Sequence, residues 1–434
     1  MSALVISGGG VLADAGTYYP EGMVVVEGRH ISYVGPSAPD ELPPNAQHID
    51  ATGCLVTPGL INAHTHAAMT LFRGIADDMG LHTWLFERVA PLEARWISPQ
   101  MVYWCTLLAA AEMLLGGVTC CIDAYFYIHD AARAYAEAGM RAVVCQGVID
   151  LPTRFSSGAD ECLEACHRLV ERWAGHNLIV PAMFPHSIYT CSPETLVRSA
   201  QVARELDCGL YIHLAETFKE VGDCIKTHGK RPVQLLKDIG VLEQLTAAVH
   251  CTWVGPHEAQ GLKDAGVVVV LCPESNMKLG CGVALFGELD AAGCELAAGT
   301  DGPASNNDLD MLGELAMLAR LAKVVVGDPT AMPAKRVLEV GWGGGAAAAG
   351  MRGELGVIKP GALADIVVWD MDQPNTTPLH DPASTLVYAA VASQARDVIV
   401  DGQMVVERGR LLKVDVREVG REVNELAARV RAGM

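Results

Sequence analysis

From residue 58 onward the chain alternates between short apolar runs and longer segments with helical spacing. The apolar runs, which we expect to be β-strands, fall at residues 60–63, 118–123, 142–149, 178–184, 209–214, 247–251, 267–271 and 294–298. Helix-like segments separate them, for example at residues 99–115, 160–174, 192–206 and 256–265. Strands that are apolar on both faces and joined by helical crossovers indicate a parallel sheet covered on both sides. Eight such units predict a (β/α)8 TIM barrel, with its active site at the C-terminal ends of the strands.

The two ends of the chain share a different pattern, in which short strands alternate with turns. It occupies residues 1–57, with strands expected at 3–6, 23–27 and 31–34, and returns after residue 356, with strands at 358–369, 398–400 and 404–407 and a helix at 417–431. Neither end is long enough to build its own core. We therefore predict one small β-sandwich made from residues 1–57 and 357–434, with the barrel (58–356) inserted between them.

Composition narrows the class of protein. Half of the 434 residues are apolar and 19% are charged, so a large core is available. The net charge of −19 comes without any basic cluster, which argues against nucleic acids and acidic membrane surfaces as partners. The fourteen cysteines are scattered and include no C-x-x-C pair, as expected for reduced thiols in a cytoplasmic protein. The start of the chain lacks the basic region of a signal peptide, and acidic residues interrupt the longest apolar stretch, so we expect no membrane span.

Polar side chains gather at the expected C-terminal ends of the strands. His64 and His66 stand one residue apart, so at the end of a strand their side chains leave on the same face. His213 and His250 lie at the ends of two other predicted strands of the same barrel, and Asp301 follows a third. Three histidines and a carboxylate form a suitable set of ligands for zinc or ferrous iron with one position open for water. The sequence therefore predicts a metal centre at this rim.

These stretches resemble the amidohydrolase superfamily over almost the whole chain. The resemblance rests on residues 58–66 (PGLINAHTH), 213–216 (HLAE), 250–251 (HC), 299–302 (GTDG) and the tail 356–365 (GVIKPGALAD). Residues 185–187 (PHS) and 301–307 (DGPASNN) resemble the methylthioadenosine/S-adenosylhomocysteine deaminase branch, to which the atrazine and triazine chlorohydrolases are related. The resemblance implies a hydrolase that removes ammonia from a 5′-modified adenosine.

The resemblance also implies roles for the residues at the rim. The metal ligands would be His64, His66, His213 and Asp301. Residues 183–187 lack the lysine that bridges two metals in binuclear members, so one divalent ion per chain is implied, with zinc expected before iron. The metal would lower the pKa of its water and supply hydroxide. Glu216 would carry the water proton to the ring nitrogen, His250 would hold the hydroxide, and Asp301 would also protonate the departing ammonia.

The resemblance extends to substrate contacts. Trp84 would stack on the ligand, and Glu93 would bind a ribose diol. His186 and Ser305 would each bond a purine ring nitrogen. Members that bind the homocysteine carboxylate use two arginines after strand 3.

Only one of those two arginines has a counterpart here, since Arg154 stands in the loop but Gln146 occupies the other place. Glutamine does not replace a bidentate guanidinium contact, which favours smaller 5′ groups such as methylthio or 5′-deoxy.

Two alternatives remain open at this level. The same scaffold could act on another heterocycle, by deaminating guanine or a pterin or by dechlorinating an s-triazine. The second alternative is a barrel without catalytic activity. Such a protein is expected to have lost metal ligands, and none of the expected metal ligands is missing. Barrels of this kind often form homodimers or homotetramers, and no residue singled out above indicates an interface.

Overall fold

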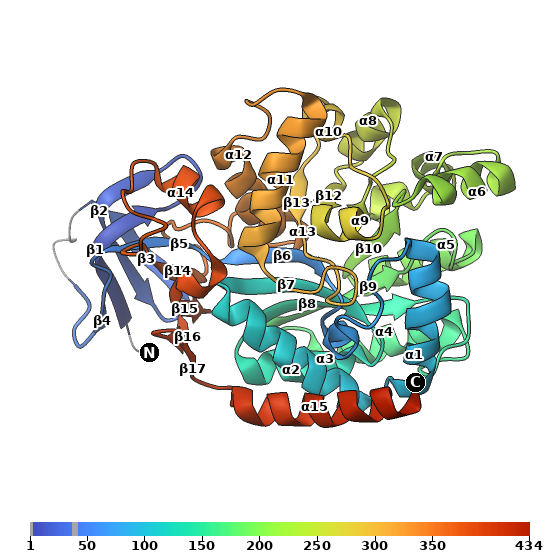
Figure 1. Cartoon of the computed structure of the whole chain (residues 1–434), viewed down its shortest axis with the longest axis horizontal. Coiled ribbons are helices and arrows are strands. Elements are labelled where there is room, and N and C mark those ends of the chain that lie inside the picture. The colour runs from blue at the N-terminus through green and yellow to red at the C-terminus, as the bar shows by residue number, and fades with distance from the viewer. Residues whose placement is uncertain (1–2, 37–41) are drawn as a thin grey trace.

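The computed structural model describes residues 3–36 and 42–434, which form a parallel barrel beside a mixed sheet (Figure 1). Residues 1–2 and 37–41, which belong to the predicted N-terminal unit, lie outside the described residues. The apolar runs become strands because each is buried on both faces.

Within the described ranges, eight parallel strands pair in chain order around the barrel. They are β6 (Leu60–Thr65), β7 (Val118–Tyr125), β8 (Arg141–Val148), β9 (Ile179–Pro185), β10 (Gly209–Leu214), β11 (Ala247–His250), β12 (Val268–Leu271) and β13 (Leu296–Ala298). The two outer strands meet, since the Asp301 amide donates to the His64 carbonyl at 3.0 Å. A Cβ atom on Gly299 would lie 2.5 Å from the His64 nitrogen, so this closure needs glycine. The predicted TIM-like barrel is confirmed.

Helices surround the barrel, and the predicted ones begin and end within two residues of the expected positions. The main crossover helices are α2 (Pro99–Leu115), α3 (Ile128–Ala138), α4 (Ala159–Trp173), α5 (Pro193–Glu205), α6 (Phe218–His228), α8 (Pro256–Asp264) and α11 (Met311–Val326). Shorter helices are α7 (Pro232–Asp238), α9 (Pro273–Lys278), α10 (Phe286–Ala291), α12 (Ala334–Glu339), α13 (Gly345–Ala348) and α14 (Pro382–Tyr388). Single turns occupy Ala67–Phe72, Leu242–Gln244, Val340–Gly344 and Ala392–Gln394.

Strands from both ends of the chain form the second sheet, as predicted. Among the described residues it has nine strands: β1 (Ala3–Leu12), β2 (Tyr18–Glu27), β3 (His30–Gly35), β4 (Gln47–Asp50), β5 (Cys54–Pro58), β14 (Ile366–Asp370), β15 (Ala395–Val400), β16 (Gln403–Glu407) and β17 (Arg410–Leu411). The antiparallel pair β5–β14 joins the N-terminal strands to the C-terminal ones. The predicted strand at 358–369 begins only at Ile366, because Lys359, Pro360 and Gly361 form a turn closed by the Ala362 amide.

The glycine run at residues 8–10 lies inside β1 rather than after a strand. The β1–β2 register shifts there, so the three glycines mark a β-bulge.

A buried ionic cluster joins the base of the barrel to the mixed sheet. Arg141 on β8 donates to both Asp365 oxygens at 3.0 Å and to Asp401 at 2.9 Å. Arg29 on the turn between β2 and β3 reaches the same Asp401 at 2.8 Å. An unpaired buried charge costs free energy, so the arginines and aspartates of this cluster must stay in contact. Their contacts hold the mixed sheet and the barrel in one arrangement.

The segment at residues 73–97 covers the mouth of the barrel. It contains a π-helix, η2 (Thr83–Val89), followed by α1 (Ala90–Trp96). The C-terminal helix α15 (Val416–Gly433) runs along α2 and ends beside α1 (Figure 1), where Arg95 donates to the Gly433 carbonyl. The covering segment is thus held from its outer side.

Within residues 3–36 and 42–434, no helix combines the length and the apolar character that a membrane crossing requires.

Candidate metal centre and active site

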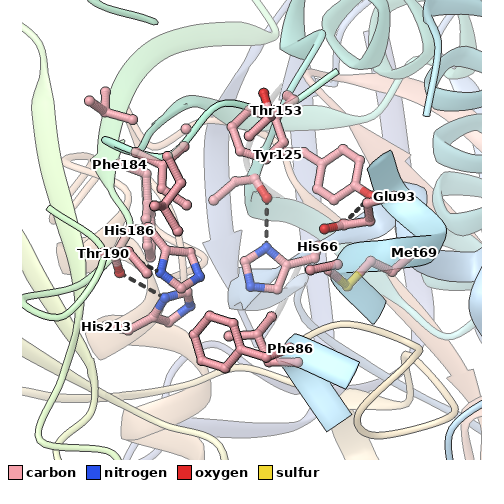
Figure 2. A pocket seen from close by; sticks show the side chains of 18 of the residues that line it. His66, Met69, Phe86, Glu93, Tyr125, Thr153, Phe184, His186, Thr190 and His213 are labelled. Atoms are coloured by element: carbon pink, nitrogen blue, oxygen red, sulfur yellow. Dashed lines mark hydrogen bonds between the residues drawn. The ribbon is translucent and has the colours of Figure 1, made fainter. Parts of the chain in front are cut away.

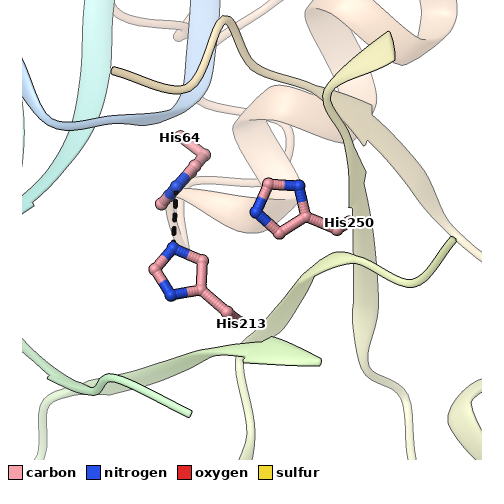
Figure 3. A group of neighbouring side chains, drawn as sticks. All are labelled: His64, His213 and His250. Atoms are coloured by element: carbon pink, nitrogen blue, oxygen red, sulfur yellow. Dashed lines mark hydrogen bonds between the residues drawn. The ribbon is translucent and has the colours of Figure 1, made fainter. Parts of the chain in front are cut away.

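Three histidine rings converge at the C-terminal rim of the barrel (Figure 3). His64 is the second-last residue of β6, His213 lies on β10 and His250 ends β11, and the three side chains point toward one another. His64 Nε2 lies 3.2 Å from His213 Nε2. Asp301, directly after β13, places Oδ1 at 3.4 Å from both His64 Nε2 and His66 Nε2. The four predicted ligands are therefore brought together, with His250 beside them.

Two of the histidine rings, those of His66 and His213, are oriented by hydrogen bonds from Nδ1, the ring nitrogen that points away from the metal centre. His66 Nδ1 donates to the Ala124 carbonyl at 2.6 Å, and His213 Nδ1 donates to the His186 carbonyl at 2.9 Å. A carbonyl accepts only, so each Nδ1 carries the proton and each Nε2 presents a lone pair. Metal-ligating histidines are held in this way, so the donor set fits a divalent cation.

Burial sets the charge of these groups. Burial lowers the pKa of His64 to about 4 and that of His213 well below its usual value, so both rings are neutral near pH 7. Burial alone would raise the pKa of Asp301, but the His64 and His66 rings hold it well below its usual range. Neutral imidazoles facing a carboxylate are the protonation states that a metal site requires.

Glu216 lies beside the metal centre, on the loop after β10. Its Oε1 is 3.8 Å from His250 Nε2 and accepts a hydrogen bond from the Cys281 thiol at 3.4 Å. Burial, and then the charges of Asp301 and Glu220, raise the pKa of Glu216 well above its usual value. A carboxyl group with a raised pKa can both accept and return a proton, as general acid–base chemistry requires.

His250 is oriented by an amide. Its Nδ1 lies 2.9 Å from Asn276 Oδ1, and Asn276 Nδ2 donates in turn to Thr252 at 2.9 Å. The His250 proton is therefore on Nδ1, and Nε2 is left as an acceptor facing Glu216. Burial lowers the pKa of His250, which keeps the ring neutral.

A cavity of about 200 Å³ opens from these residues and is walled mainly by apolar side chains. The segment at residues 73–97 supplies one wall, and Figure 2 shows Glu93 beside Tyr125 on one side of His66, with His186 and His213 on the other. A concave, largely apolar site with a few convergent polar groups is typical of a small-molecule pocket.

Several of the predicted substrate residues line this cavity. Trp84 is buried there and donates from Nε1 to the Ala304 carbonyl at 3.2 Å. Glu93 accepts a hydrogen bond from the Tyr125 hydroxyl at 2.5 Å. The Glu93 carboxyl group lies inside the cavity, where burial raises its pKa to about 7.

His186, another predicted substrate residue, lines the cavity too. Its Nδ1 lies 2.9 Å from the Thr190 hydroxyl. Burial, followed by the charges of neighbouring histidines, lowers the pKa of His186 to about 3, so the ring is neutral. It can therefore donate or accept one hydrogen bond to a ligand.

Arg154, Gln146 and Ser305 lie in three different settings. Arg154 is exposed at the rim of the cavity and donates to the Arg95 carbonyl. Gln146 is buried, donates from Nε2 to the Gly147 carbonyl at 2.9 Å, and is not among the lining residues. Ser305 is also away from the lining: its hydroxyl donates to Asp301 Oδ2 at 2.9 Å. Ser305 therefore contacts Asp301, and its bond to a purine nitrogen stays a prediction.

Comparison with known proteins agrees with this geometry. The model of the amidohydrolase family matches residues 55–405. The 5-methylthioadenosine/S-adenosylhomocysteine deaminase of Syntrophobacter fumaroxidans is 42% identical over 419 residues, covering 96% of this chain and 95% of that protein. The chain belongs to the amidohydrolase family. Among solved structures, this amidohydrolase is similar to an adenosine deaminase from Xanthomonas campestris with bound zinc, at 37% identity, 99% coverage of both chains and a TM-score of 0.96.

A second solved structure shares the fold of this amidohydrolase. The atrazine chlorohydrolase from Arthrobacter aurescens TC1, complexed with zinc, is 25% identical, with a TM-score of 0.90 over 98% of this chain and 100% of the other. The same fold, a barrel with a sheet built from both termini, is thus shared by a protein named as a deaminase and by one named as a chlorohydrolase.

Sequence reasoning missed several polar residues of the amidohydrolase site. Tyr125, Asn276 and Glu220 each bond a residue that we had singled out, and Ser275 donates to Asp301 Oδ2 at 2.6 Å. Only Tyr125 had a signal in the sequence, because it follows the second predicted strand of the barrel at its C-terminal end. Ser275 and Asn276 belong to the short helix α9 and Glu220 to the first turn of α6, and the direction of their side chains depends on tertiary packing.

Proposed function

We propose that this amidohydrolase is a metal-dependent deaminase that converts 5′-modified adenosines to the corresponding inosines and ammonia. The observation that carries the proposal is the placement of Glu216. Its carboxyl group has a raised pKa and lines the same cavity of about 200 Å³ as His66, His213 and Asp301, which are among the proposed metal donors. A deaminase needs such a group, because a proton must travel from the attacking water to a ring nitrogen.

We infer one divalent ion per chain, held by His64, His66, His213 and Asp301. Zinc is favoured because the two solved structures named above contain zinc, and because three imidazoles and one carboxylate suit it. When bound, such an ion lowers the pKa of a water molecule toward neutrality and so supplies a nucleophile. Within 183–187, no lysine is present to bridge a second ion.

The proton path follows from the side chains. Glu216 takes a proton from the attacking water and gives it to the ring nitrogen next to the attacked carbon. His250 Nε2, with its proton held on the opposite nitrogen by Asn276, accepts a hydrogen bond from the attacking water and aligns it. Asp301 is anionic and next receives the remaining water proton, which it passes to the amine as ammonia leaves. Water thus adds at carbon 6 of the purine as the carbon–nitrogen bond breaks.

The cavity supports an adenosine in one orientation. Glu93 would accept hydrogen bonds from the ribose hydroxyls, since its second oxygen is available beside the one bonded to Tyr125. His186 would bond a purine nitrogen from the opposite wall, and Trp84 would close over the ligand. Ser305 is proposed to act through Asp301, whose carboxylate it orients.

The distal end of the cavity favours small or apolar 5′ groups. The lining of the cavity includes the apolar side chains of Ile97, Phe126, Ile149 and Leu151, and Arg154, a cation of this lining, is exposed and already donates to a carbonyl. Gln146 does not reach the lining. A carboxylate at this end would therefore lack the paired guanidinium contacts that bind it strongly.

The test of this function is ammonia release from a panel of compounds, with metal content measured on the same sample. We expect turnover of methylthioadenosine and 5′-deoxyadenosine with kcat/KM at least equal to that of S-adenosylhomocysteine. Guanine and an aminotriazine serve as controls for the related chemistry. Activity on those two alone, with none on any nucleoside, would contradict the proposal. A marked preference for S-adenosylhomocysteine would contradict only the inference about the 5′ group.

The pKa of Glu93 predicts a pH-dependent affinity for ribosides. The ionised carboxylate makes stronger hydrogen bonds to the ribose hydroxyls than the neutral acid does. Because burial raises the Glu93 pKa to about 7, the charged form is scarce below that pH and predominates above it. KM for methylthioadenosine is therefore expected to fall as the pH rises through about 7 and then to level off. In Glu93→Gln, KM should be higher and nearly independent of pH; a wild-type profile in that variant would exclude the ribose role.

A further inference from the structure

We propose that Glu220 is a positioning residue that holds Glu216 in place for proton transfer. The inference rests on the proposed function, in which Glu216 is the proton carrier. Glu220 lies on the first turn of α6, four residues after Glu216, and its side chain does not line the cavity that holds His66 and Glu93. It acts through the backbone that carries the catalytic carboxyl group.

The backbone between His213 and Glu216 bends sharply at the end of β10. Ala215 has a φ of +49°, a left-handed conformation that costs free energy for a residue with a Cβ atom. Such a conformation persists only where its surroundings determine it. This bend directs Glu216 toward His250, so its geometry decides where the catalytic carboxyl group stands.

The Glu220 carboxylate bonds both amides of this bend. One oxygen accepts from the Ala215 amide at 2.9 Å, and the other accepts from the Glu216 amide at 2.8 Å. The Trp253 amide donates to the Ala215 carbonyl at 2.9 Å from the other side. The peptide units on both sides of the bend are thereby fixed, and the Glu216 side chain starts from one defined backbone position.

Capping of α6 does not by itself account for this arrangement. The hydroxyl of Thr217 already caps the helix by accepting from the Glu220 amide at 3.0 Å. A capping box would direct the glutamate to the Thr217 amide, but here the carboxylate reaches past it to residues 215 and 216. Glu220 is only 5% exposed, and within the described ranges it forms no ion pair. Burying an unpaired carboxylate costs free energy. The two hydrogen bonds that it accepts from the Ala215 and Glu216 amides offset that cost.

A control residue occupies the matching position on another crossover helix. Glu258 is the third residue of α8, is 8% exposed, and accepts from the Gly255 amide at 3.1 Å in an ordinary capping bond. It also pairs with Arg231 and does not contact Glu216. Removing its charge perturbs a buried capping glutamate without touching the bend before Glu216.

The experiment compares Glu220→Gln, Glu220→Leu and Glu258→Gln with the wild type under saturating metal. Glutamine retains one acceptor and leucine retains none, so kcat should fall about tenfold in the first and about a hundredfold in the second. KM and the metal bound per chain should change little, because neither the cavity lining nor the ligands are altered. Glu258→Gln should keep the wild-type kcat even if its melting temperature falls. A lower melting temperature with wild-type kcat in both Glu220 variants would assign Glu220 a structural role only and overturn the proposal.

A crystal structure of Glu220→Gln provides a readout that does not depend on activity. We expect the Glu216 carboxyl group to move away from His250, beyond the 3.8 Å seen here. An unmoved Glu216 would overturn the proposal. If the wild type released no ammonia from any adenosine, the proposed function would fail, and this structure would still decide whether Glu220 positions Glu216.

Discussion

Replacing Glu216 with glutamine is expected to lower kcat for methylthioadenosine by about 10²- to 10⁴-fold, the range typical of lost general acid–base catalysis. The amide has the same shape and can still accept a hydrogen bond from Cys281, so the cavity should be preserved. It cannot take a proton from water and return it to a ring nitrogen near pH 7. The measurement is steady-state ammonia release, together with the metal content of the variant.

Two results would count against this role for Glu216. The first is a kcat within a few-fold of the wild type, which would transfer proton delivery to another group such as His250 or Asp301. The second is a loss of bound metal, which would show that the variant disturbed the ligands and did not test the proton path. Glu258→Gln, which neutralises another buried carboxylate of the barrel away from the cavity, should retain full activity.

Removing the metal is expected to abolish deamination, and adding one equivalent of zinc per chain should restore it. The physical reason lies in the donors, because the imidazoles of His64, His66 and His213 and the carboxylate of Asp301 converge on one point. Without a divalent ion, the remaining groups have no means of lowering the pKa of water to near neutrality. The check is activity after dialysis against a chelator, followed by titration with zinc and with ferrous iron.

The same titration tests the number and the place of the ions. Saturation at two ions per chain would contradict the inferred single site. The melting temperature should rise as the ion binds, because a ligand that binds only the folded state stabilises it. His213→Ala should show a weaker response to zinc, whereas His129→Ala should respond like the wild type, because His129 on α3 bonds Trp173 away from the metal centre. Activity that survives complete removal of metal would overturn the proposed mechanism.

Much of the fold followed from local patterns. The apolar runs between residues 60 and 298 predicted the barrel strands because a strand buried on both faces has no polar positions to alternate with. His64, His66, His213, His250 and Asp301 were predicted to meet because the C-terminal ends of parallel strands share one rim. That inference needs only the order of the strands, and the structure brings these residues within a few ångströms of one another.

Tertiary structure alone decided what surrounds those residues. Ser305, four residues after Asp301, could have faced the base or the ligand, and the course of its loop turned it toward Asp301. Tyr125 and Glu93 come from distant segments, and their contact depends on how the segment at residues 73–97 packs over the barrel. Glu220 looks in the sequence like an ordinary capping glutamate, and only the left-handed bend at Ala215 brings two further amides within its reach.

The difference between what the sequence predicted and what only the tertiary structure decided has a physical cause. Burial and strand periodicity are written into each short stretch of chain, so the barrel, its order and the residues at its rim are determined by the sequence alone. The direction of a side chain on a loop depends on backbone angles that are set by contacts with remote segments. The sequence therefore determined which residues stand at the metal centre, and the packing of loops against one another decided which residues orient them and which line the cavity.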